Sequence, residues 1–425
     1  MNVFIAGASG FIGARLAAGC VLAGDTVICA SRDGRAPGLP GTRLAKLDYT
    51  AMPPVETLIE LLTGVDVVVN AVGILRERGT QTFEALHVAG PIALFAAAAR
   101  AGVRRIVQIS ALGAEDGASA RYHASKHRAD LALAALPVDW VIVQPSLVYG
   151  AGGASARLFE FLASLPVTPL PGTGEQRVQP VHVQDVVTAL MQILHSPAAV
   201  RGVVPFVGPV PMSLRIFLRD LREALGFPTA PSMRVPRALV ALAAAIGDRW
   251  PSALLDRETL GMLERGNTAD PAPLAGLLGR PALPVARFVA AERRAERGAA
   301  ASWRWLAPLL RVSIAAMWFI AAIVSLGPYP VERSLALLVS IGLPAAVAPL
   351  ALYGAAALDF ALGVLTLWPR RARALWNVQI ALVIAYTLII SWRLPDLWLE
   401  PFGPVAKNLP ILALLLVLRE LEGRR

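Results

Sequence analysis

Apolar residues follow two different patterns along this chain of 425 residues. Up to about residue 150, short continuous apolar runs alternate with stretches in which apolar residues recur at helical spacing. Continuous runs are typical of strands covered on both faces, so the pattern predicts an α/β fold with a doubly wound parallel sheet and a ligand at the carboxyl ends of its strands. The predicted strands are Val3–Ala6, Thr26–Ala30, Leu44–Leu47, Val65–Ala71, Arg105–Ser110 and Trp140–Gln144. The helices predicted between them are Phe11–Ala23, Val55–Leu62, Thr82–Ala101 and Ala124–Ala135.

The pattern changes after about residue 299, where long apolar segments begin. They raise the mean hydropathy of the chain to +0.57. Three of them have about the 20 residues that a helix needs to cross a bilayer, and the fourth is long enough only if it begins before Asn408. We therefore predict an all-α membrane domain of four spans, with segments at Leu306–Leu326, Ala346–Trp368, Leu375–Trp392 and Leu409–Leu418.

The region between these patterns is less regular. Residues 151–230 are expected to form a small substrate lobe of a Rossmann-type domain, followed by an apolar stretch, Val235–Ile246, that is too short to span a bilayer and is either buried or interfacial. Residues 267–284 are rich in Pro, Gly and Ala, which predicts a linker with little structure. Within the lobe we expect a helix at Leu158–Leu165, a loop at Pro166–Arg177 and a helix at Leu214–Leu225. The predicted domains are 1–230, 231–300 and 301–425.

The net charge of +10 comes from 40 Lys and Arg residues against 30 Asp and Glu residues. No basic and aromatic motif for nucleic acid accompanies this charge, and arginines gather beside the apolar segments, so a lipid bilayer is the expected partner and nucleic acid is not. Because cationic residues mark the cytoplasmic ends of spans, we predict a multi-pass protein of the inner, or cytoplasmic, membrane with both termini in the cytoplasm. The residues assigned to the cytoplasmic side are Arg293, Arg294, Arg297, Arg304, Arg370, Arg371, Arg373, Arg419, Arg424 and Arg425, and the opposite loops hold Arg333, Arg393 and Lys407.

The N-terminal residues do not have the pattern of a signal peptide. No basic region precedes the apolar stretch, and Gly7, Ser9 and Gly10 interrupt it. We therefore place the first domain in the cytoplasm. The two cysteines, Cys20 and Cys29, lie in a predicted helix and a predicted strand, so we expect buried reduced thiols, no disulfide framework and no metal site.

The first predicted strand runs directly into a glycine-rich turn, Ala6-Gly7-Ala8-Ser9-Gly10-Phe11-Ile12-Gly13. The first glycine permits the tight turn, the second lets the backbone approach a pyrophosphate, and the third allows the helix to pack closely on the strand. The N–H groups at the start of the helix then face the phosphates. This motif predicts a dinucleotide site, and the residues assigned to it are Gly7, Ser9, Gly10, Phe11, Ile12 and Gly13.

The end of the second strand indicates which dinucleotide binds. An NAD site usually has a carboxylate there for the ribose 2′-hydroxyl, whereas a 2′-phosphate needs a cation. This chain has Ser31 and Arg32 at that place, and the guanidinium offers a planar fork of donors. Asp33 lies one residue beyond, and an exposed loop arginine is the simpler alternative for Arg32. The pattern favours NADP(H) over NAD(H).

A second candidate site lies at Tyr122-His123-Ala124-Ser125-Lys126, downstream of Ser110 at the end of a predicted strand. A spacing of four places Tyr122 and Lys126 on one face of a helix. The ammonium of Lys126 and the charge of an oxidised nicotinamide would both lower the pKa of the phenol. Tyr122 is then the candidate proton donor or acceptor, Lys126 its partner, and Ser110 the residue that holds the substrate oxygen.

These motifs resemble the short-chain dehydrogenase/reductase superfamily, in particular its atypical or extended branch. The resemblance covers about the first half of the chain, including Gln144-Pro145-Ser146-Leu147-Val148-Tyr149-Gly150 and Gln179-Pro180-Val181-His182-Val183-Gln184-Asp185-Val186. The stretches from Val72 to Gly79 and from Ser110 to Ala114 are most similar to the subgroup that contains the nucleotide-binding accessory subunit of respiratory complex I. The resemblance implies that Asp48 lies near the adenine and that further coenzyme contacts come from Asn70, Ala71, Val72, Gly73, Tyr122, Lys126, Pro145 and Ser146.

Two residues depart from the superfamily pattern. His87 stands where many relatives have an asparagine, so it is either a substitute proton relay or a packed or surface histidine. Gln144 replaces an arginine that extended members often carry, which makes a nucleotide-sugar substrate less expected.

The C-terminal region resembles the DoxX-like four-helix membrane family, including the segment Ala406-Lys407-Asn408-Leu409-Pro410 before the last span. That family has proposed links to quinones and redox processes. Asp359 lies inside a predicted span, where a carboxylate is costly. It is either a functional residue or a protonated side chain that bonds to another helix.

Three functions remain open from the sequence. The first is a membrane-anchored oxidoreductase that uses NADPH to reduce a carbonyl or quinone-like, lipophilic small molecule. The second is an NADPH-binding protein without turnover that senses redox state or assists assembly. The third is an epimerase or isomerase in which hydride is removed and returned with no net use of coenzyme. The sequence does not fix the oligomeric state.

Overall fold

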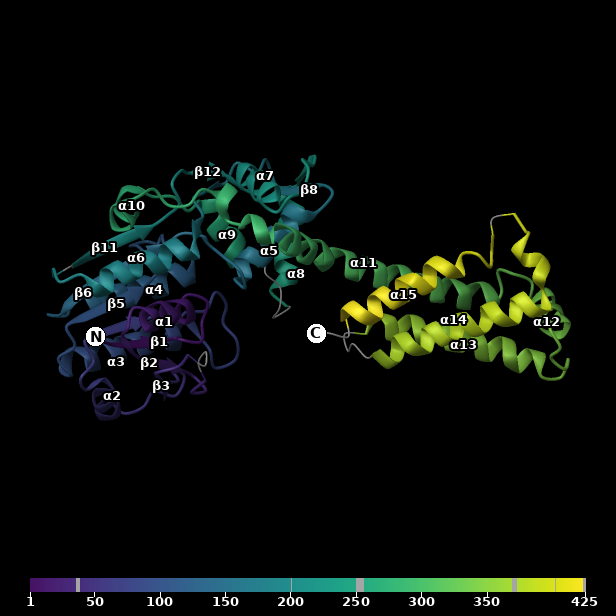
Figure 1. Ribbon diagram of the computed structural model, residues 1–425, viewed down its shortest axis with the longest axis horizontal. Coiled ribbons are helices and arrows are strands. Elements are labelled where there is room, and N and C mark those ends of the chain that lie inside the picture. Colours follow the sequence, from purple (N-terminus) through teal and green to yellow (C-terminus); the bar gives the residue numbers. More distant parts are fainter. Residues whose placement is uncertain (36–38, 200, 250–255, 369–372, 402, 423–425) are drawn as a thin grey trace. The chain divides into compact units, whose positions relative to one another are not determined.

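The computed structural model describes the whole chain except residues 36–38, 200, 250–255, 369–372, 402 and 423–425. The chain divides into two units, Met1–Ala301 and Ser302–Arg425, and each is described here by itself. Figure 1 shows a first unit that combines strands and helices and a second unit that is helical. Arg370, Arg371, Arg424 and Arg425, which were assigned to the cytoplasmic side, lie outside the described residues.

The first unit is built on a seven-stranded parallel sheet with the order β11-β6-β5-β4-β1-β2-β3, so the prediction of a doubly wound parallel sheet is confirmed. The continuous apolar runs are strands because both faces of the sheet are covered. One strand, β11, was not predicted. The strands are β1 (Asn2–Ala6), β2 (Thr26–Ser31), β3 (Thr42–Lys46), β4 (Val67–Asn70), β5 (Arg105–Ile109), β6 (Asp139–Pro145) and β11 (Arg201–Phe206).

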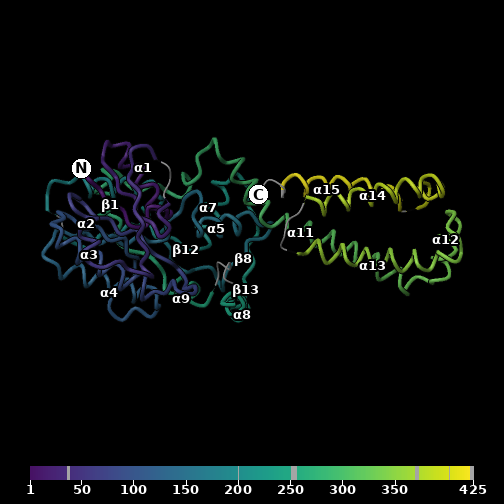
Figure 2. The backbone as a smooth tube through the Cα atoms, turned by 90° about the horizontal axis from the view of Figure 1, so that it is seen from below, coloured from purple at the N-terminus to yellow at the C-terminus, as the bar shows by residue number. Residues whose placement is uncertain are grey.

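Helices cover both faces of this sheet. Alternate residues of β1 show the two layers, because Val3 and Ile5 belong to one buried cluster and Phe4 and Ala6 to the other. In Figure 2, α1 lies on one side of β1, and α3 and α4 lie on the other. The first face is covered by α1 (Gly13–Leu22), α6 (Val183–His195) and α10 (Ala272–Leu278), and the second by α2 (Val55–Leu62), α3 (Gly90–Arg100) and α4 (Arg121–Ala134).

Two predictions about helices were wrong in detail. The expected linker at 267–284 contains α10, whose Leu274 is fully buried against the sheet, because tertiary packing outweighs its Pro- and Gly-rich composition. The single helix expected at Thr82–Ala101 begins as a π-helical turn at Glu84–Ala89, and α3 starts only at Gly90. Pro91 has no N–H to continue an α-helical ladder, which accounts for the wider turn before it.

A smaller lobe with its own buried cluster follows the sheet. Part of the expected loop at Pro166–Arg177 is a strand, β8 (Thr168–Pro171), because it pairs with β13 (Ser232–Val235) from a distant part of the chain. The lobe also contains β7 (Val148–Tyr149), β9 (Arg177–Val178), β10 (Val181–His182), β12 (Met212–Ser213), α5 (Ala154–Ser164), α7 (Leu214–Ala224), α8 (Arg237–Gly247) and α9 (Arg257–Arg265).

The second unit is all-helical. Among the described residues, three helices are long and apolar enough to cross a membrane, and α15 has 15 residues, which is about 22 Å at the rise of an α-helix and short of a bilayer core of about 30 Å. The all-helical membrane-type domain is thus confirmed with three helices of spanning length among the described residues, and the fourth predicted segment, which its sequence already marked as marginal, forms the shorter α15. The helices are α11 (Arg294–Ser325, which begins in the first unit), α12 (Val331–Ser340), α13 (Ala348–Leu367), α14 (Arg373–Arg393) and α15 (Asn408–Glu422).

The core of the second unit is apolar with a few polar pairs. α11, α13, α14 and α15 all contribute residues to it. Gly363 allows close packing of α13 on α11, because an added Cβ would lie 2.6 Å from the ring of Phe319. Inside the core, Trp318 Nε1 donates to Gln379 Oε1 at 2.8 Å, and Gln379 donates to Thr366 Oγ1 at 3.1 Å.

Candidate functional site

The glycine turn forms a cradle that only residues without side chains fit. Gly7 has φ +81°, and a Cβ there would lie 2.9 Å from the carbonyl carbon of Ala71. A Cβ on Gly13 would lie 2.2 Å from Gly7 O, and one on Gly10 would lie 3.0 Å from the same oxygen. Tight turns and close backbone packing of this kind are what a dinucleotide-binding turn requires.

The start of α1 is suited to an anion. No acidic residue lies in its first turn. Within the described parts of the chain, the backbone N–H groups of Ser9, Phe11 and Ile12 have no hydrogen-bond acceptor. Unpaired N–H groups at a helix N-terminus bind phosphate through hydrogen bonds and the helix dipole. The residues present therefore fit the diphosphate of a nicotinamide coenzyme.

At the end of β2, side chains form hydrogen bonds with the loop that directly follows the strand. Ser31 is buried, and its hydroxyl donates to Arg35 O at 2.5 Å and lies 3.2 Å from Asp33 Oδ1. Asp33 also accepts from Arg35 N at 3.2 Å, and these hydrogen bonds lower the pKa of its carboxyl. Arg32 is exposed. Of the two residues predicted to meet a 2′-phosphate, only Arg32 has its side chain in solvent.

Three other residues that the resemblance assigned to the coenzyme use their side chains within the protein. Asp48 Oδ1 accepts from Thr50 N at 2.9 Å, and Ser146 Oγ donates to Gln179 O at 2.5 Å. Asn70 is fully buried and donates to Gln108 Oε1 at 2.7 Å. These side chains hold loops at the strand ends, and any contact of theirs with a coenzyme stays a prediction.

The predicted catalytic helix is α4, which begins at Arg121 rather than at Ala124. Tyr122 and Lys126 are therefore one turn apart on the same face, as the spacing predicted. Lys126 is buried, and its Nζ donates to Val72 O at 3.0 Å and to Ile109 O at 3.1 Å. The segment Ala71–Gly73 thus lies between the glycine turn and Lys126, since Gly7 packs against Ala71 and the Cβ position of Gly73 is 3.2 Å from Lys126 Nζ.

Asp130 joins this group, and sequence reasoning missed it. Its Oδ2 accepts a hydrogen bond from Ser110 Oγ, so Ser110 can hold a substrate oxygen only by redirecting this hydrogen. Its Oδ1 is buried without a hydrogen-bond partner among the described residues. Burial raises the pKa of the carboxyl to about 6. The signal was present in the sequence, because Asp130 follows Lys126 by one more helical turn.

The pKa of Tyr122 departs from its normal value in the direction opposite to the predicted one. Burial and the charge of Asp130 raise this pKa to about 12, whereas we expected Lys126 to lower it. Burial lowers the pKa of Lys126 to about 8 because the ammonium is costly in the interior. Two hydrogen bonds of the ammonium go to main-chain carbonyls. In the protein alone, Tyr122 is therefore a neutral phenol that can donate a proton.

His87 is a packed histidine that supports this site. Its Nε2 accepts from Ile74 N at 3.0 Å, so Nδ1 carries the proton and donates to Ser125 Oγ at 2.9 Å. Ser125 in turn donates to Tyr122 O at 2.7 Å. Burial and the charge of Lys126 lower the pKa of His87 to about 2, so the ring stays neutral. Both ring nitrogens have partners, which favours the packed alternative over the proton relay.

Residues from the C-terminal part of the small lobe reach the same place. Glu258 on α9 accepts a hydrogen bond from Tyr122 N at 2.7 Å. Arg76, in the loop after β4, forms an ion pair with Asp256 and donates to Gly247 O at 3.0 Å. These contacts join positions more than a hundred residues apart, and no local sequence signal indicates them.

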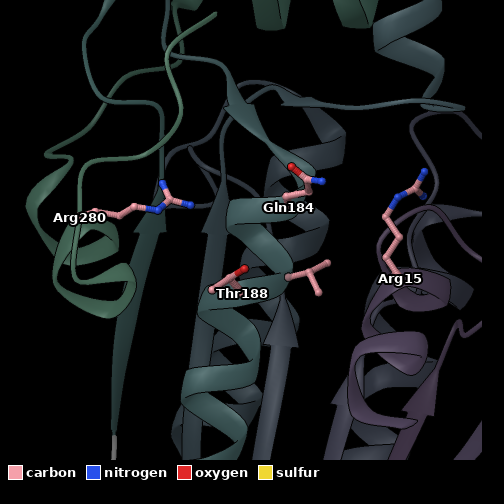
Figure 3. Close-up of a pocket in the computed structure, with 5 residues that line it drawn as sticks. Arg15, Gln184, Thr188 and Arg280 are labelled. Carbon is pink, nitrogen blue, oxygen red and sulfur yellow. The ribbon is translucent and has the colours of Figure 1, made fainter. Parts of the chain in front are cut away.

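A separate cavity of about 410 Å³ lies between α1, α6 and the segment after α10 (Figure 3). Arg15 and Arg280 flank it, with Gln184 and Thr188 of α6 between them. Both arginines are already bound within the protein: Arg15 donates to Phe11 O at 2.7 Å, and Arg280 pairs with the buried Asp185 at 2.6 Å. The predicted catalytic residues do not line this cavity, so it is distinct from the site around Tyr122.

Comparison with known proteins agrees with this description. Residues 3–204 match the NAD dependent epimerase/dehydratase family, and residues 315–416 match the DoxX-like family. A ceramide reductase of Caulobacter vibrioides is 30% identical over 141 residues, which are 33% of this chain and 44% of that protein. The rat mitochondrial NADH dehydrogenase [ubiquinone] 1 alpha subcomplex subunit 9 is 30% identical over 145 residues, 34% of this chain and 38% of that protein. The chain thus spans less than half the length of these two relatives.

Solved structures of low identity share the fold of the first unit. A nucleoside-diphosphate-sugar epimerase from Staphylococcus aureus has a TM-score of 0.56 at 18% identity, covering 68% of this chain and 99% of that one. MoeE5 in complex with UDP-glucuronic acid and NAD has a TM-score of 0.50 at 20% identity, covering 67% of this chain and 94% of that one.

Fold and site together define a Rossmann-type NAD(P)-binding protein with a membrane-type helical unit. The chain joins an N-terminal domain of the epimerase and short-chain dehydrogenase/reductase type to a C-terminal DoxX-like domain, which confirms both predicted resemblances.

Proposed function

We propose that this chain is a membrane-anchored, NAD(P)H-dependent oxidoreductase that reduces a carbonyl or quinone-like group of a lipophilic substrate. The observation that carries the proposal is that Tyr122 and Lys126 lie one turn apart on α4 and that Lys126 Nζ donates to the carbonyl of Ile109, the residue before Ser110, one packed segment away from the glycine turn. The oxidoreductase names of the curated relatives support it, as do the apolar helices that follow the domain.

A bound nicotinamide coenzyme would supply the hydride. In reduction of a carbonyl, Tyr122 donates its phenol proton to the substrate oxygen, which becomes a hydroxyl as the carbonyl carbon gains the hydride. The pKa of about 12 keeps this proton in place before the reaction. Lys126 lies on the same helical face, where an ammonium stabilises the tyrosinate left behind. Ser110 orients the substrate oxygen once its hydrogen turns away from Asp130.

We further propose that the coenzyme is NADPH rather than NADH. Arg32 is exposed at the end of β2, and the nearest carboxylate, Asp33, already accepts hydrogen bonds from its own loop. A guanidinium there suits a 2′-phosphate.

The proposed location is the inner, or cytoplasmic, membrane, with the coenzyme domain in the cytoplasm. The charge bias that supports this orientation includes Arg293, Arg294, Arg297 and Arg304 before the first span and Arg419 on the last helix. Anchoring would raise the rate at which the site meets molecules dissolved in the bilayer.

The test is oxidation of NADPH by the full-length protein in nanodiscs, with panels of long-chain ketones and quinones and with Tyr122→Phe as the matched variant. We expect oxidised coenzyme to accumulate with at least one lipophilic acceptor and Tyr122→Phe to be far slower. Coenzyme binding without oxidation on every panel would contradict the proposal and favour a non-catalytic binding role, which the similarity to complex I subunits also supports.

An epimerase or isomerase is the second candidate, because the family model that matches the first domain is that of NAD dependent epimerases and dehydratases. Substrate turnover that requires Tyr122 but leaves no oxidised coenzyme would favour this candidate.

A further inference from the structure

The helix α8 has an apolar face that none of the described residues of the first unit covers. Leu239, Leu242 and Ile246 follow one another at spacings of three and four, and their exposed fractions are 55%, 57% and 47%. On the opposite side, Val240 and Ala244 are buried against the lobe. The helix is therefore anchored by one face and offers water a continuous apolar stripe on the other.

Cationic residues stand at both ends of this stripe. Arg234 precedes the helix, Arg237 is its first residue and Arg249 follows it, and all three are exposed. Arg237 pairs with Glu264 at 3.7 Å, which leaves Arg234 and Arg249 as the cations that bound the stripe. Asp248 also lies at the carboxyl end, but it is paired with Arg257 at 3.5 Å. An apolar helical face bounded by arginines is typical of a helix that lies in the surface of a bilayer with anionic lipids.

The other exposed leucines that the structure describes in the first unit do not form such a face. Leu131 on α4 is 54% exposed, as much as the leucines of α8, but its helix has a charged or polar surface around it: Arg128 pairs with Glu84 one turn earlier. Single exposed leucines are ordinary on protein surfaces. The stripe on α8 differs because its exposed apolar residues are consecutive along one helix face.

We propose that α8 docks in the plane of the bilayer, with Leu239, Leu242 and Ile246 among the acyl chains and Arg234 and Arg249 at anionic headgroups. A bilayer is the expected partner because α11 begins at Arg294 in the first unit and continues into a helix that is apolar and long enough to cross a membrane. A second copy of the chain would bring like-charged arginines against one another, whereas anionic lipid complements them.

Docking at α8 would also place the bilayer near the candidate active site, a consequence that rests on the proposed function. Gly247 at the end of α8 accepts from Arg76, which pairs with Asp256 at the start of α9. Glu258 on α9 then accepts from Tyr122 N. A lipophilic substrate leaving the bilayer beside α8 would enter next to the segment that contacts Tyr122.

The experiment uses the full-length protein in nanodiscs and needs no turnover, so it succeeds or fails independently of the proposed reaction. A polarity-sensitive fluorophore is attached to Leu242→Cys and, as the matched control of equal exposure, to Leu131→Cys. The unsubstituted chain measures background labelling of Cys20 and Cys29, which are buried. We expect nitroxide-labelled lipids to quench the label at position 242 at least about threefold more than the label at 131, and aqueous iodide to do the reverse.

Two results would overturn the docking proposal. Equal iodide quenching at the two positions would show that α8 faces water. Protection of position 242 from both quenchers would show that protein, such as a second copy, covers the helix. The charge component has its own test: Arg234→Glu with Arg249→Glu should reduce lipid quenching in discs that contain phosphatidylglycerol and not in discs of phosphatidylcholine alone. If lipid quenching changes in neither kind of disc, anionic headgroups do not contribute to docking.

Discussion

The two units of this chain place a buried carboxylate in very different surroundings. In the first unit, Asp130 accepts from Ser110, and its charge acts on Lys126 and Tyr122, which share its helix. In the second, Asp359 is 7% exposed on an apolar helix, and its Oδ1 has no hydrogen-bond partner within the described residues. The difference lies in what accompanies the buried carboxylate. The first unit gathers a proton donor, a cation and a hydroxyl around its carboxylate.

The outer surfaces differ in the same way. Residues such as Leu350 and Trp392 leave the helices of the second unit apolar on the outside, as lipid requires. In the first unit, exposed leucines such as Leu22 and Leu131 stand singly, whereas those of α8 follow one another along one helix face. The helix α8 packs within the first unit, but its exposed face is apolar like the outer faces of the helices in the second unit.

The largest effect we predict is that of Tyr122→Phe. Removing the phenol hydroxyl leaves the ring packed against His87, whose centroid is 5.4 Å away, so the fold and coenzyme affinity should be unchanged. Loss of a positioned proton donor should lower kcat by about 100- to 10,000-fold. Steady-state kinetics in nanodiscs measure this value, and a variant with wild-type kcat would remove chemistry from this site.

The next effect concerns stability and pH. Burial raises the pKa of Asp130 to about 6 from 3.8, so its contribution to folding stability is complete below the unfolded pKa and is lost as pH rises through about 6. Asp130→Asn removes that loss. Between about pH 4 and pH 7, the free energy of unfolding of the wild-type protein should fall by on the order of 2 kcal/mol relative to that of the variant. Thermal unfolding across this range tests the sign, and parallel pH curves for the two proteins would refute it.

A smaller effect is expected at the coenzyme. Arg32→Asp replaces the exposed cation at the end of β2 with a carboxylate, so NADPH affinity should fall by about tenfold or more while NADH affinity changes little or improves. Titration calorimetry with both coenzymes measures the ratio. Equal losses would mean that Arg32 does not meet a 2′-phosphate.

The smallest effect should come from the other carboxylate. Asp359→Asn keeps the size of the side chain and lies in the other unit, so NADPH affinity should change by less than about twofold. The same calorimetry provides the measurement. A loss as large as that of Arg32→Asp would show that the two units are coupled and would break the comparison drawn above.

The sequence predicted the sheet well because its strands are buried on both faces and carry continuous apolar runs. It did not predict β11, an edge strand in which Arg201 and Val203 are exposed and Gly202 and Pro205 interrupt the apolar pattern. It also missed α10, whose place depends on burial of Leu274 against distant residues. Local pattern is informative where burial is uniform, and it fails where pairing with remote segments decides the structure.

The candidate site was predicted in the same uneven way. Tyr122 and Lys126 were found because helical spacing links them, and Asp130 could have been found by extending that spacing one turn. Glu258 could not, because only the folded chain brings α9 to Tyr122 N. The raised pKa of Tyr122 was equally out of reach, since it follows from burial and from Asp130.

The most direct test of the central claim is calorimetric titration of the purified full-length protein with NADPH and with NADH. If the glycine cradle and the start of α1 hold a nicotinamide coenzyme, both titrations should show saturable binding at one site per chain, with NADPH the tighter ligand. The absence of saturable binding for both coenzymes would contradict the account.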